Sequence, residues 1–586
     1  MRFTIGRGRL HGVSEMARNG EDVFGIALVM AGAVSAGAYT AGVVDFLFEA
    51  LDAWERRKRS GADTPHHRVE LRVLTGASAG AVTAAVLASA LRDRGYPDPE
   101  AKTPSPLHRT WVELIDLGGL LGDGDLKARP EIRSLLNASC LDEIATEVMG
   151  RQPSTRSAQD WPAYVANPLQ LYLTVTNLRG VPYSIYFQGE TGSAYGMSLH
   201  ADYMHFSLSP TGQTVSTAIP LGLADGLTGP WAELKDSALA SAAFPVGLAA
   251  RTLTRTGTLA YDSRLWPIPT AGPAKPEEPC VCQEEKTIAP AWPSPWPAQQ
   301  PRGRWHYQFV NVDGGVANNE PFELARRCLA GQDGRNPRDA KEANRAVVMV
   351  DPFPSEAAVE FDYRAEEREG LFAVLPALLG AVTAQMRFKT EELELARSPE
   401  VFSRFIIAPT RWENAGGVQR RARFALAGGG LGGFAGFLAQ PYRQHDYQLG
   451  RRNCQQFLRQ HFLLDERNPL FRSWPEALRA RFRSAGEGRS YLPIIPLFGT
   501  CAEDIPEPPW PQGKLGDIEV LRKRITARAE ALVRAFTDTR VSSGWDRFLL
   551  KTGWRIMQWR KRLFGQDMVD PLIEAIQNDL RKRELL

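Results

Sequence analysis

The sequence contains few cysteines, and their spacing suggests neither a disulfide framework nor a zinc site. Six cysteines are scattered over 586 residues, which favours a reducing compartment over a disulfide-stabilised secreted protein. Cys280 and Cys282 form one close pair, but no second pair supplies the remaining ligands of a structural zinc site. We therefore expect no bound metal and assign the pair to a loop.

The chain also lacks an excess of charge of one sign, a secretory signal and a long apolar run. A net charge of +3 with 43% hydrophobic residues is typical of a soluble globular protein and gives no reason to expect a nucleic-acid partner. Charged residues interrupt the apolar positions of residues 1–25, unlike a signal peptide. The best candidate for a membrane span, 425–439, is short and rich in glycine. We expect a cytoplasmic protein that can also touch a membrane surface peripherally.

Short apolar runs alternate with helical patterns along the first 351 residues. The helical pattern after the first run ends in several basic residues, which suit the negative end of a helix dipole. This alternation predicts an α/β fold with a mostly parallel sheet that helices cover on both faces. Such sheets place their functional sites at the C-terminal ends of strands. The expected strands are 24–30, 69–74, 169–177, 306–312 and 345–351.

The composition of the chain changes at two places. Residues 267–301 are so rich in proline that they can form neither a helix nor a central strand, so we interpret them as an inserted surface loop. After about residue 370 the pattern becomes mainly helical. The sequence thus predicts an α/β domain at 24–354, interrupted by the insertion, and a mainly helical C-terminal region at 370–586.

One serine lies in a G-x-S-x-G motif between a predicted strand and a predicted helix. Ser78 stands between Gly76 and Gly80, in the strand–turn–helix context of a nucleophile elbow. The tight turn leaves no space for larger side chains two residues before or after the serine, so glycine suits both positions. The N-terminus of the following helix favours developing negative charge. Ser78 is therefore the candidate nucleophile.

A serine nucleophile requires a base, and the histidines are poorly placed to supply it. Of the nine histidines, His306 precedes a predicted strand rather than following one, and His445 lies deep in the C-terminal region. Asp313 directly follows the strand predicted at 306–312, and Gly314 and Gly315 let the backbone turn sharply there. Asp313 is the better candidate base, although D-G-G also occurs in simple Asx turns.

The order of these motifs resembles the patatin-like phospholipase family. G-A-S-A-G at 76–80 precedes D-G-G at 313–315, as in that family, whose members use a Ser–Asp dyad without histidine. Residues 236–247 resemble its Ala- and Ser-rich segment, and 29–47 resemble its glycine-rich loop. The likeness spans residues 24–354. It implies a patatin-like α/β fold and a lipid acyl hydrolase that needs no metal or cofactor and releases fatty acid from a phospholipid or related lipid ester.

The glycine-rich loop departs from the family pattern. Where the family has G-G-G-x-[RK]-G, this sequence has G-A-V-S-A-G, in which Gly32 and Gly37 match but Ala33 and Val34 replace glycines and Ala36 replaces the basic residue. The resemblance implies an oxyanion hole built from the backbone N–H groups of Gly32, Ala33 and Val34. The altered loop leaves a second function open, a catalytically weak lipid- or partner-binding module. A serine peptidase is disfavoured by the absence of a well-placed histidine.

Two stretches of the C-terminal region stand out. Residues 437–464 concentrate polar side chains, among them Arg443, His445 and Asp446, which we interpret as a buried network joining this helix to the α/β domain rather than a Cys–His site. Residues 545–564 form an amphipathic pattern with tryptophans on one face and basic residues on another. Most such apolar faces pack on the protein itself. The alternative is contact with an anionic membrane surface.

Overall fold

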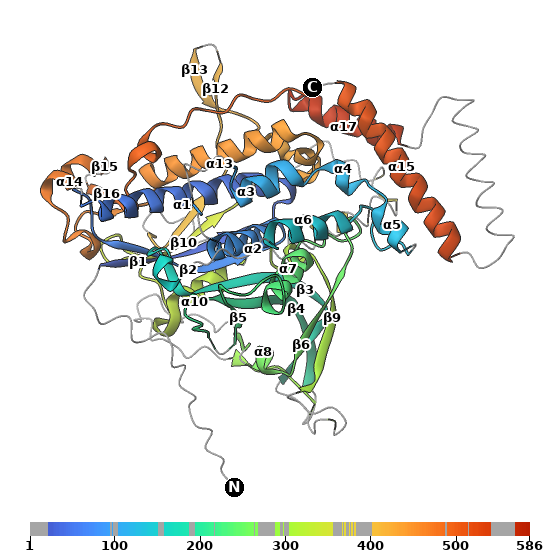
Figure 1. The fold of residues 1–586 in the computed structure, drawn as a ribbon, viewed down its shortest axis with the longest axis horizontal. Coiled ribbons are helices and arrows are strands. Elements are labelled where there is room, and N and C mark those ends of the chain that lie inside the picture. Colours follow the sequence, from blue (N-terminus) through green and yellow to red (C-terminus); the bar gives the residue numbers. More distant parts are fainter. Residues whose placement is uncertain are drawn as a thin grey trace, which may run out of the picture.

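The computed structural model describes the chain from residue 22 onward, apart from several gaps. The longest gaps are 151–156, 187–193, 268–286, 298–303, 355–365, 382–400 and 541–568. The centre of the described part is a nine-stranded sheet with the order β11-β10-β1-β2-β3-β4-β5, in which β9 joins β3 to β6 (Figure 1). The strands are β1 Val23–Met30, β2 Arg68–Gly76, β3 Val165–Tyr186, β4 Ala194–Leu208, β5 Ile219–Leu221, β6 Arg251–Thr256, β9 His306–Val312, β10 Arg345–Val350 and β11 Arg404–Ile407.

The sheet has a parallel half and a largely antiparallel half. Strands β11, β10, β1, β2 and β3 are all parallel. Beyond them β3 pairs antiparallel with β4 and β9, and β9 pairs antiparallel with β6, while β5 is parallel to β4. The α/β class and the five expected strands are confirmed. The antiparallel direction of β9 was not anticipated, and it brings the end of β9 toward the middle of β3.

Strand β1 shows why the central strands are continuous apolar runs. Its alternate residues point to opposite faces: Ile26 and Leu28 join the main hydrophobic core, whereas Ala27 and Val29 pack in a second cluster with α10 (Phe322–Ala330). Since helices cover both faces, the strand has no solvent side that would require polar residues.

The main core lies on the face of the sheet that carries α2. Helix α2 (Ala79–Arg92) contacts β1, β2 and β3, and α1 (Gly37–Arg59) and α13 (Gln440–Gln460) lie side by side above it (Figure 1). Helices α1 and α13 approach closely at Gly42, where a Cβ would lie 2.0 Å from the carbonyl oxygen of Tyr447. This close packing joins the first helix of the α/β domain to a helix of the C-terminal region.

The described part also contains further helices and strands. Helix α7 (Pro230–Ser241) packs on β3 and α2, and α6 (Ser139–Met149) packs on α7. The remaining helices are α3 Pro106–His108, a π-helical turn Arg109–Leu114, α4 Leu117–Leu120, α5 Gly124–Ala128, α8 Leu259–Asp262, α9 Gly315–Asn318, α14 Glu476–Phe482, α15 Leu515–Arg540 and α17 Asp570–Lys582. The remaining strands are β7 Trp266–Pro267, β8 Thr287–Ile288, β12 Trp412–Ala415, β13 Val418–Arg421, β14 Leu463–Asp465, β15 Ser484–Gly486 and β16 Arg489–Pro493.

The C-terminal region is mainly helical, as expected, and it shares the core of the α/β domain. Leu449 and Cys454 of α13 belong to the same hydrophobic cluster as Phe24 of β1, and β11 extends the central sheet. A smaller cluster, which includes Ile518 and Ile573, holds α15 against α17. The domain boundary expected between 354 and 370 stays a prediction.

One helix in the described part of the chain is long and apolar enough to cross a membrane by length and composition. It spans Val34–Arg59, and 89% of its most apolar window is buried inside the protein, as in a core helix. The glycine-rich stretch 425–439 forms three short 3₁₀ turns, Ala427–Gly429, Leu431–Gly433 and Ala435–Leu438. Residues 545–564 and most of the proline-rich insertion lie outside the described residues.

Candidate active site

Ser78 occupies a strained turn between β2 and α2. Strand β2 ends at Gly76 and α2 begins at Ala79, so Ser78 lies at the N-terminus of the helix with φ 49° and ψ −119°. A non-glycine residue in this left-handed region is uncommon and is retained where the surroundings enforce it. A Cβ on Gly76 would lie 2.5 Å from the backbone of Gly80, and one on Gly80 would lie 2.1 Å from the carbonyl oxygen of Met30. Neither position accommodates a side chain.

Asp313 lies within hydrogen-bonding distance of Ser78, although 235 positions separate them in the sequence. The Ser78 hydroxyl donates to Asp313 Oδ2 at 2.6 Å. The N–H of Gly315 donates to Oδ1 at 2.7 Å, which leaves Oδ2 facing the serine. Asp313 is only 4% exposed. The carboxylate that the sequence pointed to thus meets the serine hydroxyl directly.

The end of β9 holds this aspartate in place. Val312 pairs with Thr176 of β3, and the Thr176 hydroxyl donates to the carbonyl oxygen of Asp313 at 2.7 Å. The backbone N–H of Asp313 donates to the carbonyl oxygen of Ala243 at 2.8 Å. A Cβ on Gly314 would lie 2.2 Å from the carbonyl oxygen of Thr174, so the turn after Asp313 fits against β3 only with glycine.

The Ala- and Ser-rich segment at 236–247 joins the two turns. Its Ser241 accepts a hydrogen bond from the Ser78 backbone N–H on Oγ at 2.9 Å. The carbonyl oxygen of the same residue accepts the N–H of Gly314 at 2.9 Å. Ser241 therefore fixes the serine turn relative to the aspartate turn. Sequence reasoning noted the segment but did not assign a role to Ser241.

Burial shifts the acidity of Asp313. Removal from water raises the pKa of the Asp313 carboxyl to about 6, while the hydrogen bonds from Ser78 and Gly315 act in the opposite direction. At neutral pH the Asp313 carboxyl is mainly ionised and can accept a proton. Because its pKa lies close to neutral pH, it can also return that proton later in the reaction.

The glycine-rich loop lies directly beside Ser78. A Cβ on Gly32 would lie 3.2 Å from Ser78 Cβ and 2.3 Å from Asn319 Oδ1, so this position also requires glycine. The Gly32 N–H donates to the carbonyl oxygen of Asn319 at 3.2 Å. In the described residues, the N–H groups of Ala33 and Val34 have no hydrogen-bond acceptor. The Gly32 N–H is therefore already engaged within the protein, and the oxyanion hole expected at Gly32, Ala33 and Val34 stays a prediction.

Three further motif positions have distinct structural roles. Val34 has φ 49°, which for a β-branched residue costs on the order of 1–3 kcal/mol. Gly37 lies against the ring of Trp111, where a Cβ would be 2.5 Å from the nearest ring atom. Gly315 is tightly enclosed as well, since a Cβ there would lie 2.5 Å from Asn319 Oδ1.

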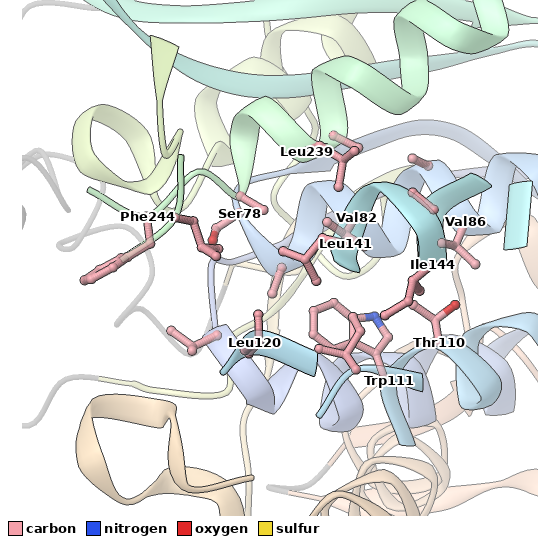
Figure 2. Close-up of a pocket in the computed structure, with 18 of the residues that line it drawn as sticks. Ser78, Val82, Val86, Thr110, Trp111, Leu120, Leu141, Ile144, Leu239 and Phe244 are labelled. Carbon is pink, nitrogen blue, oxygen red and sulfur yellow. The ribbon is translucent and has the colours of Figure 1, made fainter. Parts of the chain in front are cut away.

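An apolar cavity extends from Ser78 (Figure 2). Its lining comes from several elements: Val82 and Val86 project from α2, Leu141 and Ile144 from α6, and Leu239 from α7 (Figure 2). The cavity residues also include Trp111, Phe244, Phe434 and Phe437. Its few polar residues are Ser78, Thr110, Lys235 and Asp313. A long apolar group can therefore lie beside the serine.

Several cavity residues carried no recognisable signal in the sequence. Trp111 comes from the π-helical turn, and Phe434 and Phe437 come from the glycine-rich stretch of the C-terminal region. No local motif links any of them to Ser78, and Phe434 and Phe437 lie more than 300 positions away from it.

The histidines considered as bases lie in other parts of the fold. His445 Nδ1 is paired with Asp446 Oδ1 at 2.9 Å, and its ring meets Trp510 edge-on at 5.1 Å. His306 lies at the start of β9, at the opposite end of the strand from Asp313. None of the described residues that line the cavity is a histidine. Within the described part of the chain, no group of three or more His, Cys, Asp or Glu residues could hold a metal ion.

The fold and this site together define an α/β protein with a serine at a strand-to-helix turn, a framework typical of serine hydrolases. The family model described as "Patatin-like phospholipase" matches residues 28–326. The chain is also 36% identical to "Uncharacterized protein y4iI" of Sinorhizobium fredii (strain NBRC 101917 / NGR234), in an alignment covering 96% of this chain and 83% of that protein. The chain belongs to the patatin-like phospholipase family, as its motifs predicted.

Proposed function

We propose that this protein is a serine lipid acyl hydrolase that cleaves phospholipids or related lipid esters with a Ser78–Asp313 dyad. The observation that carries the proposal is the 2.6 Å hydrogen bond between Ser78 Oγ and the buried Asp313 carboxylate at one end of an apolar cavity. Membership of the patatin-like phospholipase family supports a lipid ester as the substrate.

The first chemical step is acylation of the serine. Asp313 Oδ2 accepts the hydroxyl proton as Ser78 Oγ adds to the ester carbonyl carbon. The carbonyl oxygen becomes an oxyanion, which the free N–H groups of Ala33 and Val34 stabilise. The tetrahedral intermediate collapses when the alcohol leaves with the proton held by Asp313. The products are a lysolipid or other alcohol and an acyl-serine.

The second step releases the fatty acid. Asp313 removes a proton from a water molecule, whose oxygen adds to the acyl carbonyl carbon. The resulting intermediate expels Ser78 Oγ, which recovers its proton from Asp313, and the free acid departs. The hydrogen bond from Gly315 to Oδ1 keeps Oδ2 directed at the reacting atoms in both steps.

The apolar lining of the cavity supports a preference for lipid esters. Its lining is almost entirely apolar, and each buried methylene of an acyl chain contributes about 0.8 kcal/mol. A chain of several methylenes in contact with Val82, Leu141 and Ile144 is therefore bound far better than an acetyl group. The proposed enzyme accordingly favours long-chain over short-chain esters.

A second candidate function is a lipid- or partner-binding module with little turnover. The observation in its favour is the glycine-rich loop, where Val34 holds a strained conformation and no basic residue stands at Ala36. Such a module binds fatty acid in the cavity without cleaving esters.

The deciding experiment measures fatty acid release from mixed phospholipid vesicles by mass spectrometry. We expect release by the purified wild type and a loss of about 10³-fold or more in both Ser78→Ala and Asp313→Asn. Circular dichroism and thermal unfolding check that both variants keep the fold. A wild type that binds fatty acid but releases none supports the binding module instead.

A further inference from the structure

A glycine-rich segment of the C-terminal region lies against the oxyanion loop. This segment, 427–438, meets the loop at Ser35, the residue after Val34. The Ser35 hydroxyl donates to the carbonyl oxygen of Gly433 at 2.5 Å and accepts the N–H of Gly436 at 3.1 Å. Ser35 is 1% exposed, so water does not compete for these bonds.

The contact is too close for larger residues in the segment. A Cβ on Gly436 would lie 2.4 Å from Ser35 Oγ, and one on Gly433 would lie 3.3 Å from Val34 Cβ. Gly433 also has φ 93°, which disfavours any side chain there. The glycines that made 425–439 a poor candidate for a membrane span are the residues that allow this approach.

Asp446 of α13 holds the other end of the segment. Its two carboxylate oxygens accept the N–H groups of Ala427 and Gly428 at 2.8 and 2.9 Å. Asp446 is 1% exposed, and its neighbour Arg443 donates to the carbonyl oxygen of Gly436 at 2.9 Å. The buried polar residues expected at 437–464 are present, and they fasten the segment to α13.

The segment also contributes to the acyl cavity. Phe434 and Phe437 line it, and the Phe434 ring meets Phe244 edge-on at 5.7 Å. Phe244 belongs to the 236–247 segment, which fixes the turn of Ser78. The C-terminal segment therefore contacts both the oxyanion loop and the wall of the substrate cavity.

The loop needs such support because of its own sequence. Val34 adopts φ 49°, a conformation that a β-branched residue leaves unless its surroundings hold it. Its N–H and that of Ala33 must nevertheless point at the developing oxyanion. Ser35 is anchored at two points of the segment and follows Val34 directly, so it fixes the backbone on one side of the strained residue.

We propose that segment 427–438 is a built-in part of the active site, which holds the N–H groups of Ala33 and Val34 in position through Ser35. Ser35 and Asp446 are thus positioning residues, and the C-terminal region is required for the reaction itself. The proposal rests on the proposed hydrolase function, since it assigns the segment a role in stabilising the oxyanion of that reaction.

The test is Ser35→Ala in the full-length chain, which removes the hydrogen bonds of the Ser35 hydroxyl and adds no bulk. We expect kcat for a lipid ester to fall about 10- to 100-fold, with KM changed by less than about threefold. The serine oxygen adds to the carbonyl carbon of a long-chain trifluoromethyl ketone, and the former carbonyl oxygen becomes an oxyanion. The affinity for this ketone falls by the same factor as kcat/KM. The affinity for the corresponding trifluoromethyl alcohol, which forms no adduct, stays unchanged.

Ser209→Ala is the matched control. Ser209 is equally buried, donates to Asn167 Oδ1 at 2.7 Å and accepts the N–H of Gln213 at 2.9 Å, but it lies outside the residues of the site. Its replacement should lower thermal stability to a similar degree and leave kcat and ketone affinity at wild-type values. Equal losses of activity in both serine variants would show that Ser35 acts only through stability and would overturn the proposal.

Asp446→Asn provides a second, independent variant, because it weakens the anchor of the segment without touching the loop. A loss of kcat and ketone affinity in parallel, smaller than in Ser35→Ala, supports the proposal. An active wild type whose kcat survives both substitutions overturns this inference alone. A wild type that neither cleaves esters nor binds the ketone overturns the hydrolase function along with it.

Discussion

At the scale of single residues, burial changes the acidity of the carboxylate that contacts Ser78, that of Asp313. The turn after β9 removes it from water, leaving it with one donor from the backbone and one from the serine. Burial raises its pKa to about 6 against the opposing effect of these hydrogen bonds. An aspartate in water is a weaker base, so the same burial that destabilises the anion makes it better suited to take the proton of Ser78.

The pH dependence of activity follows from this pKa. Asp313 must be ionised to accept a proton, so kcat/KM for a soluble ester should rise with pH, with a slope of one, through a pKa of about 6. It should reach a plateau above about pH 7 and fall about tenfold for each unit below pH 5. Initial rates between pH 4.5 and 8.5 measure the profile, with thermal unfolding at each pH as the control. A flat profile over that range would contradict the role of Asp313.

Histidine should be dispensable for the reaction. The described histidines lie outside the lining of the cavity, and His445 is paired with Asp446. Replacing each of the nine histidines singly by glutamine should leave kcat/KM within about fivefold of wild type. One variant as inactive as Ser78→Ala, yet still folded, would replace the dyad by a triad.

At the scale of elements, the site depends on how closely β1, β2 and α2 approach. A Cβ at Gly80 would collide with the backbone of Met30 in the central strand, which cannot move without disturbing the sheet. Gly80→Ala should therefore destabilise the fold by about 1–3 kcal/mol and reduce activity with it. Gly226, which has nothing within 4 Å of its Cβ position, is the matched control. Gly226→Ala should change the free energy of unfolding by less than about 0.5 kcal/mol, as measured by urea denaturation.

The cavity between α2 and α6 should set the acyl-chain preference. Ile144 of α6 projects into it (Figure 2), so Ile144→Trp fills space that an acyl chain would occupy. The variant should lose about tenfold or more in kcat/KM on a sixteen-carbon ester, because several methylenes lose their contacts. Its activity on an acetyl ester, which does not reach Ile144, should be retained. Equal losses on both esters would place the acyl chain elsewhere.

The sequence revealed the elements and residues whose patterns depend on near neighbours in the chain. The strands around β1 were predictable since burial on both faces makes them apolar runs. Strand β4 was not predicted, although apolar residues alternate with Gly196, Ser198, His200 and Asp202 along its first part. Ser78 and Asp313 were found because tight turns require glycine beside them. Ser241 and Phe434 were not, since their roles arise from contacts with residues that lie far away in the sequence.

At the scale of the whole molecule, the N-terminal and C-terminal parts of the sequence share one sheet and one core and meet at the candidate active site. Helix α13 packs along α1, β11 extends the sheet, and the glycine-rich segment reaches the oxyanion loop. The family model, by contrast, ends at residue 326. Described residues beyond it, among them Gly433 and Phe434, are therefore part of the structure around the site, and variants at such positions are expected to alter turnover as well as stability.

A lipid hydrolase must also draw its substrate from an aggregate, and residues 544–565 are the candidate for surface contact. They carry six basic and one acidic side chain, although they lie outside the described residues. Each basic residue near an anionic membrane contributes about 1 kcal/mol of attraction. Reversing Arg555, Arg560 and Arg562 to Glu should therefore weaken binding to anionic vesicles at least about tenfold and slow their hydrolysis, while a soluble short-chain ester is cleaved at the wild-type rate.

The control for this prediction carries the same change of charge elsewhere on the surface. Reversing the exposed residues Arg129, Arg335 and Lys341 to Glu should affect vesicle binding much less, because a general loss of positive charge acts weakly across a Debye length of about 8 Å at physiological salt. Sedimentation with vesicles of stated phosphatidylserine content measures binding in both triple variants. If both lose vesicle binding equally, the attraction comes from the charge of the whole molecule. If the 544–565 variant loses activity on the soluble ester as well, that segment packs on the protein, and its apolar face belongs to the core rather than to a membrane.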